Sequence, residues 1–317
     1  LSDNTTGSSN SKQREVFKAV TINGVVAFEQ LSFTFSYPKA WQGEQISLWQ
    51  DYFISALEAL VEHCCETPRL GFTPDDFPLL NASLNQLDSL IPILEQKHNI
   101  ALDNIQDIYP LTALQSGMLF ETLYAQTDSN NGMYLTQSAI GFHGQADINA
   151  LQLAWQQVVN HYDALRMQVV TDNGAGINTG LQVICRQVEV TINRIDWSEK
   201  NDPELKAACE IWMQESKRRG MDFEQGGLMR MSLFQGKASC YLLFEQHHIM
   251  LDGWSQSIVL SNLFKLYQSR LNPETGNEYQ LPATAPYRAY VQLVLNTAQE
   301  EEAAYWQDYL SQYEVRT

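Results

Sequence analysis

Apolar positions follow two different periods along residues 104–313, and this difference divides that part of the chain into strands and helices. Short apolar or alternating runs, typical of strands, occupy residues 133–142, 164–170, 181–185, 188–195, 228–234 and 239–246. Apolar positions three or four residues apart, typical of helices, occupy residues 148–162, 203–219, 259–267, 287–295 and 298–313. Because strands alternate with helices, we expect an α/β (layered α+β) fold in which helices flank a mixed sheet.

The first part of the chain has a different pattern. Residues 1–16 are rich in Ser, Asn, Thr and Gly without apolar periodicity, and we expect them to be flexible. Asn23 and Gly24 separate two β-prone runs, and since type I′ turns need positive φ at both central positions, this pair predicts a hairpin turn. A further strand is expected at residues 31–37, and a helix that packs on this sheet at residues 46–64.

Two prolines mark the end of this first region. Pro74 and Pro78 interrupt the periodicity, and a short helical pattern at residues 84–98, itself interrupted by Pro92, follows them. We interpret residues 84–103 as a linker that docks on a neighbouring domain. The predicted domains are therefore residues 17–83 and 104–317.

Composition narrows the classes of function. The chain has 37 acidic and 20 basic residues, and its net charge of −17 repels nucleic acid and anionic lipid. No apolar run approaches the roughly 18 residues of a membrane span, and no signal peptide is evident, so we expect a cytoplasmic protein without a membrane partner. The five cysteines lack CxxC spacing, and neither a Walker loop nor GxGxxG is present; we expect neither a metal nor a directly bound cofactor.

The most informative stretch runs from Phe244 to Ser255. His247 and His248 end an apolar strand, and Asp252-Gly253 follow just before a helical pattern. Because successive strand residues point to opposite faces, only one of the two histidines can face a given cavity. A histidine pair alone is more often structural, but Asp252 is placed to fold back and hold an imidazole or pair with an arginine.

This stretch resembles a known family. Residues 247–253 match the HHxxxDG signature of condensation domains of non-ribosomal peptide synthetases, a superfamily that shares its fold with chloramphenicol acetyltransferase. Upstream, Tyr109–Phe120 (YPLTALQSGMLF) resembles the opening motif of these domains, and His161–Arg166 (HYDALR) resembles their RHExLR motif. The resemblance implies that residues 104–317 form the first, chloramphenicol-acetyltransferase-like lobe of a condensation domain, without its second lobe.

The resemblance also implies roles for the motif residues. His248 is the active-site histidine, either a general base toward the acceptor amine or a group that orients this amine and stabilises the tetrahedral intermediate. His247 is a packing residue. Asp252 faces out of the site and forms a buried ion pair with Arg166; the alternative is that Arg166 is a surface residue.

Three further residues are candidates. Gly253 and the start of the helix after it would supply backbone N–H groups near the reacting oxygen. Ser255 is a weaker candidate because it could equally cap that helix. Gln115 in the opening motif is weaker still, and a structural role for it is equally expected.

Residues 17–80 resemble the C-terminal portion of an epimerisation domain of the same superfamily, a partial second lobe whose own HHxxxDG lies outside this chain. The order of the two regions, together with the form of the opening motif, implies a condensation domain that joins a D-configured donor to an L-aminoacyl acceptor. Because the family's channel runs between two lobes, we expect this chain alone to be inactive.

The substrates would be thioesters on phosphopantetheine arms that partner carrier domains present, with adjacent synthetase domains as further partners. Three alternatives remain open. The chain could be a non-catalytic docking platform for carrier proteins, an epimerisation-type domain, or a stand-alone acetyltransferase.

Overall fold

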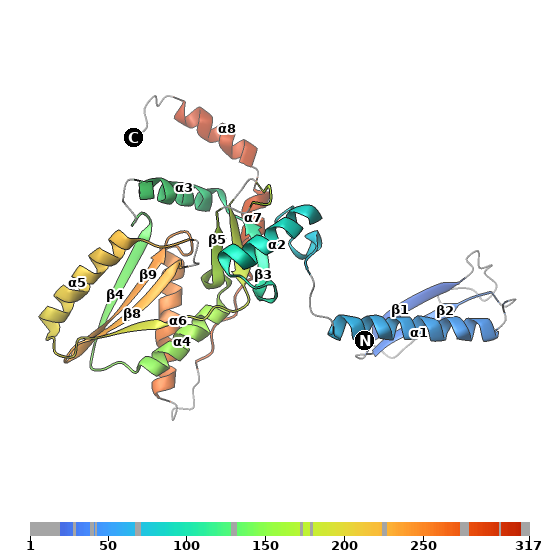
Figure 1. The fold of residues 1–317 in the computed structure, drawn as a ribbon, viewed down its shortest axis with the longest axis horizontal. Coiled ribbons are helices and arrows are strands. Elements are labelled where there is room, and N and C mark those ends of the chain that lie inside the picture. The colour runs from blue at the N-terminus through green and yellow to red at the C-terminus, as the bar shows by residue number, and fades with distance from the viewer. Residues whose placement is uncertain are drawn as a thin grey trace. The chain divides into compact units, whose positions relative to one another are not determined.

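The computed structural model describes residues 20–27, 30–38, 41, 43–66, 71–127, 132–171, 174–177, 180–223, 227–272, 279–297 and 299–311. The chain forms two compact units, Leu1–Leu70 and Gly71–Thr317 (Figure 1). The predicted flexibility of residues 1–16 lies outside the described residues.

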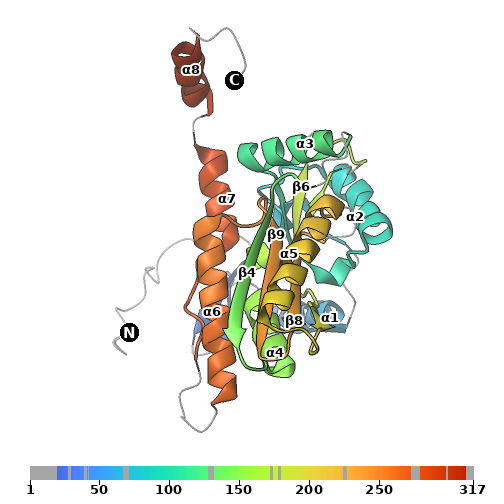
Figure 2. The ribbon, with the colours of Figure 1, turned by 90° about the vertical axis from the view of Figure 1, so that its left-hand side faces the viewer.

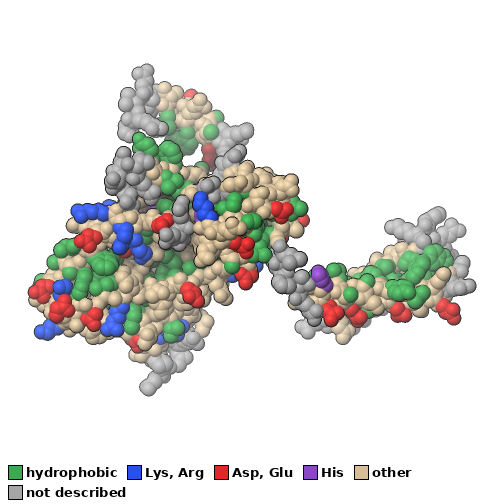
Figure 3. All heavy atoms as spheres, viewed as in Figure 1, with side chains coloured by type: hydrophobic (Ala, Val, Ile, Leu, Met, Phe, Trp, Pro, Cys, Tyr) green, Lys and Arg blue, Asp and Glu red, His purple; other side chains and the backbone are tan. Residues whose placement is uncertain are grey.

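The first unit is a two-stranded antiparallel sheet with one helix. Strands β1 (Thr21–Ala27) and β2 (Gln30–Ser36) pair along their whole length, and Phe53 of α1 (Gly43–Glu66) contacts Phe33 and Phe35 with ring centroids 4.9 and 5.5 Å apart. Many of its apolar side chains are exposed, as Figure 3 shows.

The predicted turn at Asn23-Gly24 is wrong. Both residues lie inside β1, where Gly24 pairs with Phe33, and the pairing continues as far as Ala27 and Gln30. A Cβ atom on Gly24 would lie 3.0 Å from the Phe33 ring. This glycine therefore makes room for a cross-strand aromatic ring, and it does not form a turn.

The first α-helix of the second unit is α2 (Leu84–His98), which packs on a three-stranded antiparallel sheet. The sheet has the order β3 (Ile105–Pro110), β6 (Leu181–Cys185), β5 (Met167–Val170). Leu87, Leu90 and Leu94 of α2 are buried in one core with residues of β3 and β6. Residues 84–103, predicted to be a linker that docks on a neighbouring domain, do pack on this sheet; the helix belongs to the second unit and continues through Pro92.

A four-stranded mixed sheet forms the rest of the core. Its order is β4 (Leu135–His143), β9 (Ser239–His247), β8 (Met229–Gln235), β7 (Ile192–Asp196), and only β7 and β8 are parallel. The strands predicted from residue 133 onward are thus confirmed in outline, but they belong to two sheets. Leu135, the first residue of the edge strand β4, pairs with His247, so the start of β4 lies beside the HHxxxDG motif.

Helices cover both faces of the mixed sheet (Figure 2). Trp155 of α4 (Ile148–His161) contacts Phe244 of β9 with ring centroids 5.5 Å apart, and α6 (Gly253–Leu271) packs beside α4 in the same core. Leu205 of α5 (Asp202–Arg219) packs with Leu243 on the opposite face. The alternation of Leu243 and Phe244 therefore places a helical layer on each side of β9.

Three helices remain. Helix α3 (Ala113–Thr127) follows β3, and helices α7 (Tyr287–Asn296) and α8 (Gln299–Leu310) follow α6. Short 3₁₀ turns span Pro74–Asp76, Leu102–Asn104 and Asp163–Arg166. Among the helices that the structure describes, none has the length and apolar character to cross a membrane.

Candidate active site

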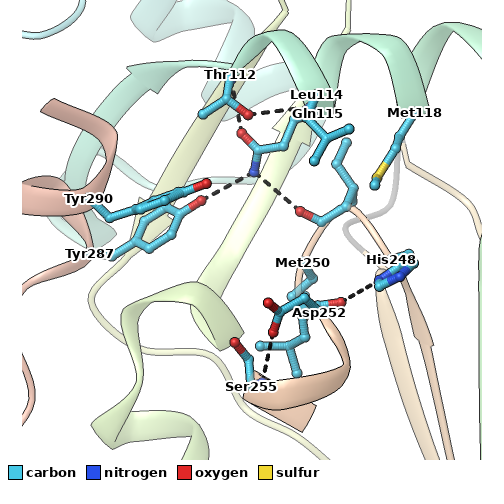
Figure 4. Close-up of a pocket in the computed structure, with 12 residues that line it drawn as sticks. Thr112, Leu114, Gln115, Met118, His248, Met250, Asp252, Ser255, Tyr287 and Tyr290 are labelled. Carbon is cyan, nitrogen blue, oxygen red and sulfur yellow. Dashed lines mark hydrogen bonds between the residues drawn. The ribbon is translucent and has the colours of Figure 1, made fainter. Parts of the chain in front are cut away.

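His248 follows the last residue of β9 and lines a pocket of about 450 Å³. The pocket lies between the start of α3, the turn at residues 248–252, the start of α6, and α7 (Figure 4). Its lining is Thr112, Leu114, Gln115, Met118, His248, Ile249, Met250, Leu251, Asp252, Ser255, Tyr287 and Tyr290. The opening motif and the HHxxxDG motif therefore meet here.

A backbone carbonyl sets the tautomer of His248. Its Nδ1 lies 2.7 Å from the carbonyl oxygen of Leu251, and because a carbonyl oxygen only accepts, Nδ1 carries the proton. The lone pair of the neutral ring is then on Nε2, which has no hydrogen-bond partner among the described residues. The backbone N–H of His248 also donates to the carbonyl of Tyr134, 2.9 Å away. His248 is therefore a fixed, half-buried base at the pocket wall.

His247 lies on the other face of β9 and is 1% exposed. Its Nδ1 accepts the N–H of Ile249 at 3.1 Å, so Nε2 carries the proton and donates to Thr122 Oγ1 of α3 at 3.0 Å. Burial, aided by the nearby His248, lowers the pKa of His247 to about 4. His247 is thus a neutral group that packs and joins β9 to α3.

Asp252 caps helix α6. Its Oδ1 accepts the N–H of Ser255 at 2.7 Å, and the hydrogen bonds from Ser255 hold the pKa of this carboxyl below its ordinary value. The expectation that Asp252 faces out of the site is wrong, since both Asp252 and Ser255 line the pocket. Gly253 is the first residue of α6 and has open space around it; its role as an N–H donor stays a prediction.

The predicted ion pair between Asp252 and Arg166 is wrong. Arg166 is 5% exposed, which also excludes the surface alternative, and its NH2 group lies 2.6 Å from Asp163 Oδ1. Its NH1 group donates to Gln106 Oε1 at 2.6 Å and to the carbonyls of Cys185 and Arg186. Arg166 ends a 3₁₀ turn beside the three-stranded sheet, so its partner is the carboxylate three residues back.

Gln115 connects the pocket's elements. Its Nε2 lies 3.2 Å from the carbonyl of Ile249, 3.2 Å from Tyr287 Oη of α7, and 3.3 Å from Gln182 Oε1 of β6. Its Oε1 accepts the N–H of Thr112 at 3.0 Å. Gln115 therefore holds the residue after His248 against α3, β6 and α7, which is the structural role expected as one of its two possibilities.

Two groups at the site were not identified from the sequence. Tyr287 and Tyr290 of α7 line the pocket, and burial raises the pKa of Tyr287 to about 12. The ring of Tyr109 lies 6.3 Å from that of Tyr287, and its Oη donates to Asp107 at 2.8 Å. Asp107 also lies 3.5 Å from Arg288 NH1, and burial raises the pKa of Asp107. No local signal marks these residues, because they join segments more than 150 positions apart.

The donor set at the site consists of one imidazole, one carboxylate, hydroxyls and amides. In the part of the chain that the structure describes, no group of three or more His, Cys, Asp or Glu side chains could hold a metal ion. The arrangement can accept a proton at His248 Nε2 from a group bound in the pocket.

The comparisons with known proteins agree on one family. A family model described as the condensation domain matches residues 105–317. One of the linear gramicidin synthase proteins of Brevibacillus parabrevis is 33% identical over 93% of this chain, which spans 5% of that protein. Bacitracin synthase 1 of Bacillus licheniformis is 30% identical over 94% of this chain, which spans 5% of that protein.

Solved structures show the same fold. The starter condensation domain of rhizomide synthetase superposes with a TM-score of 0.54 at 19% identity, over 65% of this chain and 48% of that chain. The first condensation domain of the CDA synthetase gives a TM-score of 0.53 at 21% identity, over 65% and 51%. The predicted fold class is thus confirmed, and this chain spans about half the length of these structures.

Proposed function

The chain belongs to the condensation-domain family of non-ribosomal peptide synthetases, and we propose that it forms an amide bond between two carrier-bound substrates. The observation that carries this proposal is the pocket of His248. Its proton-bearing Nδ1 is held by the Leu251 carbonyl, and the basic Nε2 is left for a substrate.

The geometry supports a role in proton transfer. As the amine nitrogen of the acceptor attacks the donor's thioester carbonyl, a C–N bond forms and Nε2 of His248 accepts the proton that the amine loses. Collapse of the tetrahedral intermediate breaks the C–S bond, and the proton passes to the leaving thiolate. The same Nε2 position also suits orientation of the amine, so the two roles predicted for His248 share one geometry.

We propose further that the donor is D-configured and the acceptor is an L-aminoacyl thioester. The form of the opening motif supports this subtype, as does the resemblance of residues 17–80 to the end of an epimerisation domain. The relatives add support, because residues 71–317 alone could not cover the 93% of the chain that aligns with the linear gramicidin synthase protein. A region similar to the first unit therefore precedes the condensation region in that protein.

The partners in this proposal are carrier domains and neighbouring synthetase domains. The carriers would present both substrates on phosphopantetheine arms, which are long enough to reach a pocket from the protein surface. The cytoplasm, where such synthetases meet activated amino acids, is the proposed location.

The test is dipeptide formation by the intact parent synthetase with D- and L-configured donors. We expect His248→Ala to lower the rate by roughly 10² to 10⁴ while carrier loading is unchanged, because a positioned base contributes about this factor. His143→Ala is the matched control, since His143 is an exposed histidine at the opposite end of β4.

Each outcome separates two interpretations. Near-wild-type condensation by His248→Ala would favour the docking platform, and exchange of the donor's α-proton without amide formation would favour an epimerisation-type domain. An equal rate with both donors would refute the proposal of a D-configured donor but not the proposal of amide-bond formation.

A further inference from the structure

The carbonyl that fixes His248 accepts a second hydrogen bond. Leu251 O lies 2.7 Å from His248 Nδ1 and 3.3 Å from Nε2 of Gln246. Because a carbonyl oxygen has two lone pairs, both donors are accommodated. Gln246 is therefore a second donor to the oxygen that holds His248 Nδ1.

Gln246 is built into the core beside the motif. It is 1% exposed and precedes His247 in β9, so its side chain leaves the strand on the same face as that of His248. Burial at this level keeps water from replacing it as a donor to Leu251.

The orientation of the Gln246 amide is fixed by its partners. Its Nε2 donates to Leu251 O and, at 3.2 Å, to Gln256 Oε1 of α6. A flipped amide would place Oε1 against the carbonyl oxygen of Leu251, which is repulsive. In the observed orientation Oε1 is buried with no hydrogen-bond partner in the described part of the chain.

An unpaired buried acceptor costs stability, and an apolar side chain of the same length would avoid that cost. The residue nevertheless presents two N–H groups, one of them to the carbonyl that holds His248. The second N–H donates to Gln256 Oε1, and Gln256 Nε2 in turn donates to Ser138 Oγ of β4. The side chain of Gln256 is therefore held in place and anchors the Gln246 amide. A polar chain thus runs from β4 through α6 and β9 to the imidazole.

We propose that Gln246 is a positioning residue that holds the Leu251 carbonyl and thereby keeps His248 as the tautomer with a free Nε2. The inference rests on the proposed function for its catalytic meaning, since only there is Nε2 the atom that handles the proton. The hydrogen bonds themselves lie within the chain and do not depend on which substrates it uses.

The first readout is the tautomer of His248, measured by ¹⁵N NMR on the 317-residue chain at a pH where the ring is neutral. We expect wild type to show the form protonated at Nδ1, and Gln246→Met to show a substantial fraction protonated at Nε2. The matched control is Gln137→Met, which removes bonds of 2.8 Å each to Met213 O and Glu245 Oε1, neither of which belongs to this turn. Gln256→Met, which removes only the anchor, should give a smaller change in the same direction.

The second readout is kinetic, in the parent synthetase. Gln246→Met should lower kcat roughly ten- to a hundredfold with KM for the carriers unchanged, as expected when a base is misplaced and binding is intact. A wild-type tautomer and kcat in Gln246→Met, or an equal shift in Gln137→Met, would overturn the inference. If wild type forms no amide bond, the proposed function fails, but the NMR comparison still decides the role of Gln246.

Discussion

At the scale of single residues, Arg166 gives the sharpest stability prediction. Replacing it by Met leaves Asp163 and three other acceptors without their cation, so we expect a loss of about 3 to 5 kcal/mol in unfolding free energy. Arg194→Met, which removes an exposed pair 3.9 Å from Asp196, should lower the unfolding free energy much less, because solvent screens this pair. Denaturant unfolding measures both.

A double-mutant cycle then tests the choice of partner. Coupling between positions 166 and 163 should be clear, whereas coupling between positions 166 and 252 should be near zero because the two side chains have separate partners. Strong coupling between 166 and 252 would contradict the observed geometry.

The residues of this site differ in how far sequence could predict them. That His248 faces a pocket was predictable, because strand alternation and the HHxxxDG spacing are local patterns. The partner of Arg166 was not, since Asp163 and Asp252 are both carboxylates near motif residues and only the fold decides between them. Gln246 carries no signal of its own, because its role depends on a turn that bends Leu251 back toward β9.

At the scale of elements, the start of α6 is both a helix cap and a wall of the pocket. Asp252→Ala removes the acceptor for the Ser255 N–H and should cost about 1 kcal/mol. Asp147→Ala, at the equivalent cap of α4 with bonds of 2.9 and 3.0 Å, is the matched control. We expect similar losses of stability from both, but a loss of condensation only from Asp252→Ala, because only Asp252 lines the pocket.

The cap of α6 should also respond to pH. The folded pKa of Asp252 lies below its ordinary value of 3.8, so the unfolded chain binds this proton more readily than the folded chain does. The contribution of Asp252 is therefore fully present above pH 3.8 and is lost as the pH falls through the folded pKa. Thermal unfolding of wild type and Asp252→Ala should converge in acid; a difference that persists below the folded pKa would contradict this.

Elements also show where periodicity fails as a predictor. Pro92 suggested an interrupted helix, yet the helix continues through it, and Leu90 and Leu94 on either side of the proline are buried in the core. Asn23 and Gly24 suggested a turn, yet the pairing of Gly24 with Phe33 uses the missing side chain for packing. In both cases a tertiary contact overrides a local preference.

At the scale of the whole chain, the helices that contribute to the pocket carry large exposed apolar side chains. Leu114 and Phe120 of α3, Trp254 of α6 and Leu293 of α7 are each at least 65% exposed. Where exposed apolar side chains of this size are contiguous, they mark an interaction surface. This chain spans only about half of each similar condensation-domain structure.

We therefore predict that the 317-residue chain by itself forms no amide bond and self-associates. With the pocket open to water, the two thioesters are not held together, and polar contacts with His248 are weakened by solvent. Mass measurement by light scattering should show association that Phe120→Glu reduces, whereas Ile211→Glu, a matched exposed position on α5, leaves it unchanged. Turnover of carrier-bound substrates by the isolated chain would show that these residues suffice for catalysis and would refute the prediction.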